Sequence, residues 1–217
     1  MQTEPGVDGS DSSTFAQTLE SLKREGCNIL IVGASATAAH EAVCHRLLGD
    51  LSAHDRYRLT VTGEGVTYRS QTCHHGHAGS NTRVVAYPDG PTTAETDTPQ
   101  NPLGTFGADF IDAIREIEAD ANGLEPAELR VCVDSLVPLL TEYETETVFK
   151  LLHLTSVSVK NAHGMGHYHL PVARDHDAVN LLEPLFDAIV EVRTRGERTE
   201  QRWHLRDQST ASDWLEL

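Results

Sequence analysis

Lysine and long apolar runs are scarce in this sequence, and both shortages argue against whole classes of protein. Lysine occurs only three times, and 17 Lys and Arg residues stand against 33 Asp and Glu residues, which gives a net charge of −16. A chain this acidic offers no general basic face, so we expect no direct contact with nucleic acid. No apolar run reaches about 18 residues, so we expect no membrane helix. The polar start of the chain lacks the apolar segment of a secretory signal, and we expect a cytoplasmic protein.

Paired cysteine motifs are also missing. The four cysteines are Cys27, Cys44, Cys73 and Cys132, and none forms a C-x-x-C pair. This spacing argues against a disulfide framework and against a zinc ribbon, and we expect buried, reduced thiols. The dense carboxylates are typical of a salt-adapted, haloarchaeal surface, on which they keep the protein solvated while salt screens their repulsion.

Strands and helices alternate along most of the chain. We predict strands at 28–32, 58–62, 83–86, 129–133 and 168–172, and helices at 15–24, 37–48, 104–121, 141–159 and 177–186. Two further strands, 188–194 and 201–205, form a closing antiparallel hairpin. This order predicts an α/β fold with a mostly parallel sheet covered on both faces. We divide the chain into a disordered tail at 1–13, one domain at 14–206 and a second tail at 207–217.

A strand followed by a glycine and a helix marks the start of the domain. A phosphate-binding loop in this setting reads Gly, any four residues, then Gly-Lys-Ser/Thr. Here Gly33 fills the first position, but Ala38, Ala39 and His40 fill the positions of the second glycine, the lysine and the hydroxyl residue. The lysine binds the β- and γ-phosphates and the hydroxyl holds Mg²⁺, so the loop has lost both functions.

An acidic residue, Asp134, follows the apolar strand at 129–133. A carboxylate at that end of a parallel strand can position Mg²⁺, although it can equally cap the following turn. A backbone concavity and a helix N-terminus can attract an anion without lysine. The predicted binding residues for a nucleotide such as ATP are therefore Gly33, Ser35, Thr37, Ala38, Ala39, His40 and Asp134.

Histidines gather in two places. Cys73, His74, His75 and His77 offer thiolate and imidazole ligands for Zn²⁺, although their spacing fits no standard finger and a solvated loop has the same composition. His167 and His169 point to the same side of a predicted strand because side chains alternate, and there we expect a packed or hydrogen-bonded pair.

Four stretches carry a resemblance to known proteins: residues 33–40, 130–140, 164–171 and 185–192. They resemble the RecA/KaiC-like P-loop ATPase superfamily, and more closely a haloarchaeal branch often labelled HTR-like or KaiC-like. The resemblance covers about residues 15–206. It implies a RecA-like three-layer sandwich with a degenerate P-loop and a regulatory or signalling role in the cytoplasm.

The departures from that superfamily shape the functional expectation. With Ala39 and His40 in place of lysine and Ser/Thr, efficient hydrolysis is not expected, and we assign no catalytic residue. We expect a non-catalytic regulatory or scaffold protein that acts through a protein partner or self-association, without a resident cofactor. One alternative is a residual nucleotide-binding protein or weak ATPase. The other is a metal-binding protein that uses the His-rich loop at 73–77.

Overall fold

One eight-stranded sheet organises the fold. The computed structural model describes residues 9–49, 56–63, 81–88, 101–206 and 211–217. In these ranges the strands run in the order β3-β2-β4-β5-β1-β6-β7-β8. The six from β3 to β6 are parallel, and β7 and β8 each pair antiparallel to the preceding neighbour. The strands are β1 Cys27–Val32, β2 Tyr57–Thr62, β3 Thr82–Ala86, β4 Leu129–Val133, β5 Met165–Leu170, β6 Ala188–Arg195, β7 Arg198–Leu205 and β8 Leu215–Glu216.

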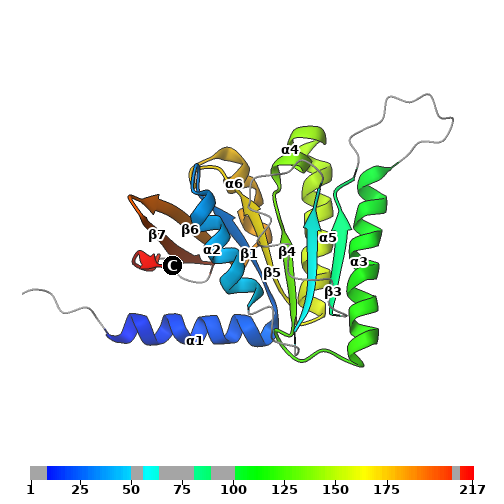
Figure 1. Ribbon diagram of the computed structural model, residues 1–217, viewed down its shortest axis with the longest axis horizontal. Coiled ribbons are helices and arrows are strands. Elements are labelled where there is room, and N and C mark those ends of the chain that lie inside the picture. The colour runs from blue at the N-terminus through cyan, green and yellow to red at the C-terminus, as the bar shows by residue number, and fades with distance from the viewer. Residues whose placement is uncertain (1–8, 50–55, 64–80, 89–100, 207–210) are drawn as a thin grey trace, which may run out of the picture.

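Helices cover both faces of this sheet (Figure 1). Helices α3 to α6 pack on one face, and α2 lies on the other with α1 at its side. The helices are α1 Gly9–Glu25, α2 Thr37–Leu48, α3 Pro102–Ala121, α4 Val137–Glu142, α5 Thr145–Asn161 and α6 Asp177–Leu182, and a 3₁₀ turn follows at Glu183–Leu185. Within the described ranges, none of the helices combines the length and the apolar character that crossing a bilayer requires.

The central strand β1 shows why this sequence forms a two-sided sheet. All six of its residues are buried, which suits a parallel strand with helices on both faces. Leu30 and Val32 face the larger core with α3 and α5, whereas Ile29 and Ile31 face the smaller core with α2. Period-two alternation therefore divides one short apolar run between two cores.

The α2 face of the sheet is unusually polar for an interior. On β4 the buried residues of this face are Arg130 and Cys132, with Asp134 just beyond the strand, and on β5 they are Met165, His167 and His169. The opposite face of the same two strands carries Val131, Tyr168 and other apolar residues. This contrast concentrates the reactive side chains between α2 and the sheet.

The C-terminal residues close one edge of the sheet. Strand β8 pairs with β7, and the Trp214 ring lies under two guanidinium groups, with Arg193 at 3.7 Å and Arg202 at 4.7 Å from the ring centroid. Cation–π contacts of this kind hold an aromatic residue on a charged surface. Residues 211–217, which we assigned to a tail, therefore pack on the hairpin.

The predicted fold class is confirmed at the level of a mixed α/β protein with a mostly parallel sheet and a closing antiparallel hairpin. Two details differ. The helix predicted at 141–159 is two helices, because Tyr143 and Glu144 adopt extended conformations between α4 and α5. Thr141, at which the predicted helix begins, lies inside α4, and its hydroxyl donates to the Val137 carbonyl at 2.8 Å. Helix α1 begins at Gly9, inside the segment that we assigned to the first tail.

Candidate metal centre

Two cysteines and two histidines from three elements meet beneath α2. Cys44 comes from α2, Cys132 from β4, and His167 and His169 from β5. One ligand atom from each lies within 4.8 Å of the others, and all four residues are buried. We call these four residues the thiol–imidazole cluster. The cluster can hold a metal ion.

Regular secondary structure brings the four ligands together. Strands β4 and β5 are parallel neighbours, and Cys132 lies opposite His167 in their register. His169 follows two residues later on the same side of β5, with its ring centroid 5.3 Å from that of His167. On α2, Cys44 lies one helical turn after His40, so both side chains point toward the sheet.

Two of the distances within the cluster are close to those between the ligands of a tetrahedral ion. The Sγ atoms of Cys44 and Cys132 are 3.6 Å apart, and Nε2 of His167 is 3.4 Å from Sγ of Cys44. Bonds of about 2.3 Å to sulfur and about 2.0 Å to nitrogen place tetrahedral ligand atoms about 3.8 Å apart for two sulfurs and about 3.5 Å apart for sulfur and nitrogen. The side chains of Cys132 and His167, and helix α2 with Cys44, therefore need little movement to bind an ion.

A third histidine extends the cluster toward the end of β1. Nδ1 of His40 is 2.9 Å from Nδ1 of His169, and Nε2 of His40 is 3.0 Å from the carbonyl oxygen of Gly33. His40 is 3 % exposed and Gly33 is buried as well. A chain of buried polar contacts therefore runs from the cluster to the loop that follows β1.

A cavity of about 250 Å³ lies at this edge of the sheet. It opens where the carboxyl ends of the parallel strands meet, which is the usual position of ligand sites in open α/β folds. His169 belongs both to this cavity and to the thiol–imidazole cluster. The cavity is lined by Ala34, Ser35, Ala36, Thr37, His40, Asp134, His169 and Pro171.

The structure separates the residues predicted for a nucleotide into two groups. Ser35, Thr37, His40 and Asp134 line the cavity. Gly33, Ala38 and Ala39 do not: a Cβ atom on Gly33 would lie 2.2 Å from the Val192 carbonyl oxygen, Ala38 is exposed, and Ala39 is fully buried in the core under α2. The side chain at the lysine position of the loop therefore faces the core and not the cavity.

The predicted metal ligands Cys73, His74, His75 and His77 lie outside the described residues. The cluster that the structure shows uses other residues, and sequence reasoning did not assemble it. The two signals available were the His-x-His spacing in β5 and the spacing of four between His40 and Cys44. Neither spacing indicates which strands are neighbours, so the sequence alone did not join them.

Cys27 is the described cysteine that lies outside the cluster. It is fully buried at the start of β1, in the smaller core. Burial, with a smaller effect from the Asp187 carboxylate, raises the pKa of the Cys27 thiol to about 12. This thiol therefore stays protonated and is a natural control for the two cysteines of the cluster.

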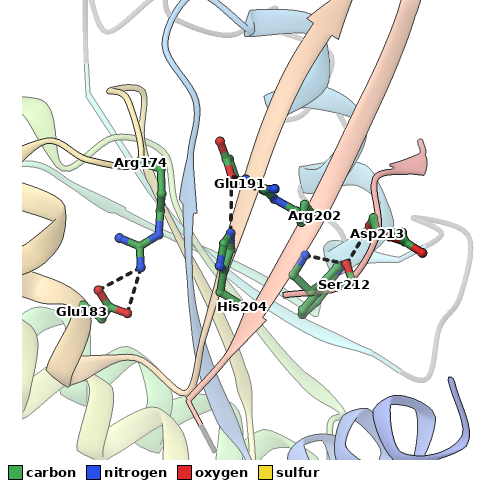
Figure 2. A network of polar contacts seen from close by, with 8 residues as sticks. Arg174, Glu183, Glu191, Arg202, His204, Ser212 and Asp213 are labelled. Carbon is green, nitrogen blue, oxygen red and sulfur yellow. Dashed lines mark hydrogen bonds and ion pairs between the residues drawn. The ribbon is translucent and has the colours of Figure 1, made fainter. Parts of the chain in front are cut away.

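A second group of charged residues, on the hairpin and beside it, is paired internally (Figure 2). Oε2 of Glu191 accepts from Arg202 Nη2 at 2.6 Å and lies 3.3 Å from Nε2 of His204, and Arg174 donates to both carboxylate oxygens of Glu183. Burial works against ionisation of Glu191, but the contacts with Arg202 and His204 hold its pKa below the usual range. Burial and the nearby guanidinium groups lower the pKa of His204. We assign the contacts of Glu191 with Arg202 and His204 to holding β6 and β7 together.

The fold and the cluster define an α/β protein with a buried set of metal-ligand side chains. Residues 26–192, more than three quarters of the chain, match a family described as "Family of unknown function (DUF7504)". The chain therefore belongs to this family. No curated protein matches it. Strand β1, the thiol–imidazole cluster and the cavity all lie within the matched residues.

Proposed function

We propose that this protein binds one Zn²⁺ ion in the thiol–imidazole cluster, and that the ion fastens α2 to the sheet. The observation that carries the proposal is the meeting of four buried donors within 4.8 Å. Thiolate and imidazole are the ligands that Zn²⁺ prefers, and two of each make a standard four-coordinate site. Ions that prefer oxygen ligands, such as Mg²⁺ and Ca²⁺, have no carboxylate in this set.

Charge also favours a divalent ion. An isolated charge in a protein interior is strongly destabilising, whereas two thiolates and one Zn²⁺ ion sum to zero. The ion would join Cys44 to Cys132 and His167, which are 88 and 123 residues away in sequence. One site would thereby connect a helix and two strands that are distant in the chain.

The ligand set supports a non-catalytic role. Catalytic zinc sites keep one position open for water or substrate, whereas four protein side chains close the site. The domain would then act as a regulatory or scaffold protein through a protein partner or self-association. Ala39 supports the same view, because its position in the core leaves the cavity without the lysine of a phosphate-binding loop.

Residual nucleotide binding is the second candidate, and the cavity at the sheet edge is the observation that favours it. Ser35, Thr37 and Asp134 line that cavity. Its volume of about 250 Å³ is below the range of about 300 to 1,000 Å³ that is usual for ligand pockets. We therefore rank this candidate below the zinc site.

Metal content and Co²⁺ spectroscopy test the proposal. The protein, purified without an affinity metal, should take up one equivalent of Zn²⁺. Co²⁺ in its place should show the intense visible bands of a tetrahedral site and the sulfur-to-cobalt charge transfer of thiolate ligands. The double variant Cys44→Ser/Cys132→Ser should remove the charge-transfer band, each single variant should weaken it, and Cys27→Ser should keep it in full.

The His-rich loop requires its own control. A variant with Cys73→Ser and alanine at His74, His75 and His77 should still bind one equivalent and give the same Co²⁺ spectrum. If that variant loses the metal, or if the Cys44→Ser/Cys132→Ser double variant keeps the thiolate spectrum, the ion is held elsewhere and the proposal is wrong.

A further inference from the structure

We propose that His40 is the positioning residue of the metal centre, which orients His169 as a ligand. This inference rests on the proposed zinc site and adds a residue that does not touch the ion. The His40 side chain joins His169 to the loop after β1, through a 2.9 Å contact on one side and a 3.0 Å contact on the other.

The contacts of His40 assign the protons on both rings. A carbonyl oxygen can only accept, so Nε2 of His40 carries a proton and donates to Gly33. Nδ1 of a neutral His40 is then an acceptor, and the proton between the two rings belongs to Nδ1 of His169. A neutral His169 with its proton on Nδ1 carries a lone pair on Nε2. Nε2 is a buried atom, and it is the nitrogen left to bind a metal.

The Gly33 carbonyl is fixed in place. It is the first member of the relay, by which we mean the hydrogen bonds from Gly33 through His40 to His169. The Gly33 amide donates to the Val172 carbonyl at 2.9 Å, and the close approach of Val192 leaves no room for a side chain at Gly33. A rigid acceptor holds the His40 ring, and the His40 ring holds His169. Metal-bound histidines generally donate their second nitrogen to such an outer partner, which fixes the tautomer and the ring orientation.

The cavity explains why His169 needs this support. His167 contacts the sulfur of Cys44 within the cluster, whereas His169 also lines the cavity at the sheet edge. Without an acceptor at His40, the ring of His169 can turn into that space and leave the ion. Loss of the relay should therefore weaken metal binding and speed metal release without changing the set of ligands.

Two substitutions at His40 separate hydrogen bonding from packing. His40→Asn keeps an oxygen acceptor near the position of Nδ1 but removes much of the ring. His40→Leu fills more of the buried space and has no acceptor. If the relay operates, His40→Leu should lower Zn²⁺ affinity by about 10- to 100-fold, and His40→Asn should restore most of it. His45→Leu, an exposed position on the same helix, should match the wild type.

The measurements are Zn²⁺ affinity by competition with a chelating dye, the rate of chelator-driven Zn²⁺ release and the Co²⁺ spectrum. The expected result is faster release from His40→Leu with an unchanged tetrahedral thiolate spectrum. A packing role predicts the opposite ranking, with Leu closer to the wild type than Asn, and that ranking would overturn the inference, as would equal affinity in all variants. If the wild type binds no Zn²⁺, it is the proposed function that fails.

Discussion

Zinc should raise the melting temperature of this protein in proportion to the logarithm of its concentration. The proposed ion would bind the folded cluster, whose side chains come from α2, β4 and β5, and the unfolded chain does not hold them together. A ligand at 100 times its Kd stabilises the folded state by about 2.7 kcal/mol. For a chain of this size, 1 kcal/mol shifts the melting temperature by about 2 to 4 °C, so we expect a rise of about 5 to 11 °C.

The assay is thermal unfolding at several buffered concentrations of free Zn²⁺, followed by circular dichroism. Each tenfold increase in free Zn²⁺ above the Kd should add about 1.4 kcal/mol, which corresponds to about 3 to 6 °C. Cys132→Ser should melt at the same temperature at all these concentrations. Cys27→Ser is the matched control, because Cys27 is equally buried but lies outside the cluster, and it should keep the full zinc-dependent shift.

Equal shifts in the two serine variants would refute the reasoning, since the stabilising ion would then not be bound by Cys132. A wild-type melting temperature that does not change with zinc would refute it as well. A lower starting temperature in both variants is expected, because each replaces a fully buried thiol by a hydroxyl group.

Three further predictions concern single residues. In zinc-free protein, hydrogen peroxide should oxidise Cys44 and Cys132 to a disulfide, because their sulfurs are 3.6 Å apart. The two thiols lose two electrons and two protons, and peroxide becomes two waters. Mass spectrometry should show the loss of two hydrogens in the zinc-free protein and no such loss when Zn²⁺ is bound. Because the pKa of Cys27 is about 12 when folded and about 8.5 when unfolded, its contribution to stability is present below pH 8.5 and is lost as the pH rises toward 12. Urea titrations should therefore show a flatter alkaline decline for Cys27→Ala, and an equally steep decline would contradict this. Gly33→Ala should destabilise the fold by about 1 to 3 kcal/mol in the same assay, because its Cβ would lie 2.2 Å from the Val192 carbonyl oxygen, and unchanged stability would show that the loop relaxes.

The sequence predicted most of the strands well because a short apolar run is a local property. The apolar run at 28–32 corresponds to β1, and the run at 129–133 to β4. The break between α4 and α5 was not predictable in this way. Tyr143 and Glu144 lie at the break, and neither is a glycine or a proline, the residues that commonly mark the end of a helix.

The thiol–imidazole cluster illustrates what local patterns cannot show. Its members lie at 44, 132, 167 and 169, and no two cysteines are close in sequence. The pairing of β4 with β5 places Cys132 opposite His167, and that pairing is a property of the whole sheet. The sequence shows His40 as a substitution in a phosphate-binding loop. Its contact with His169 depends on the position of β5 beside β1, which the sequence does not show.

The wide spacing of the ligands also determines when an ion can bind during folding. Cys44 must meet partners that are 88 and 123 residues later in the chain, so the site is complete only after β4 and β5 have joined the sheet. Long-range contacts of this kind form late, because the intervening chain must first be ordered. Zinc would therefore not nucleate this fold. It would bind molecules that have already finished folding. The fraction of the protein that carries metal in a cell would therefore report the fraction that is folded.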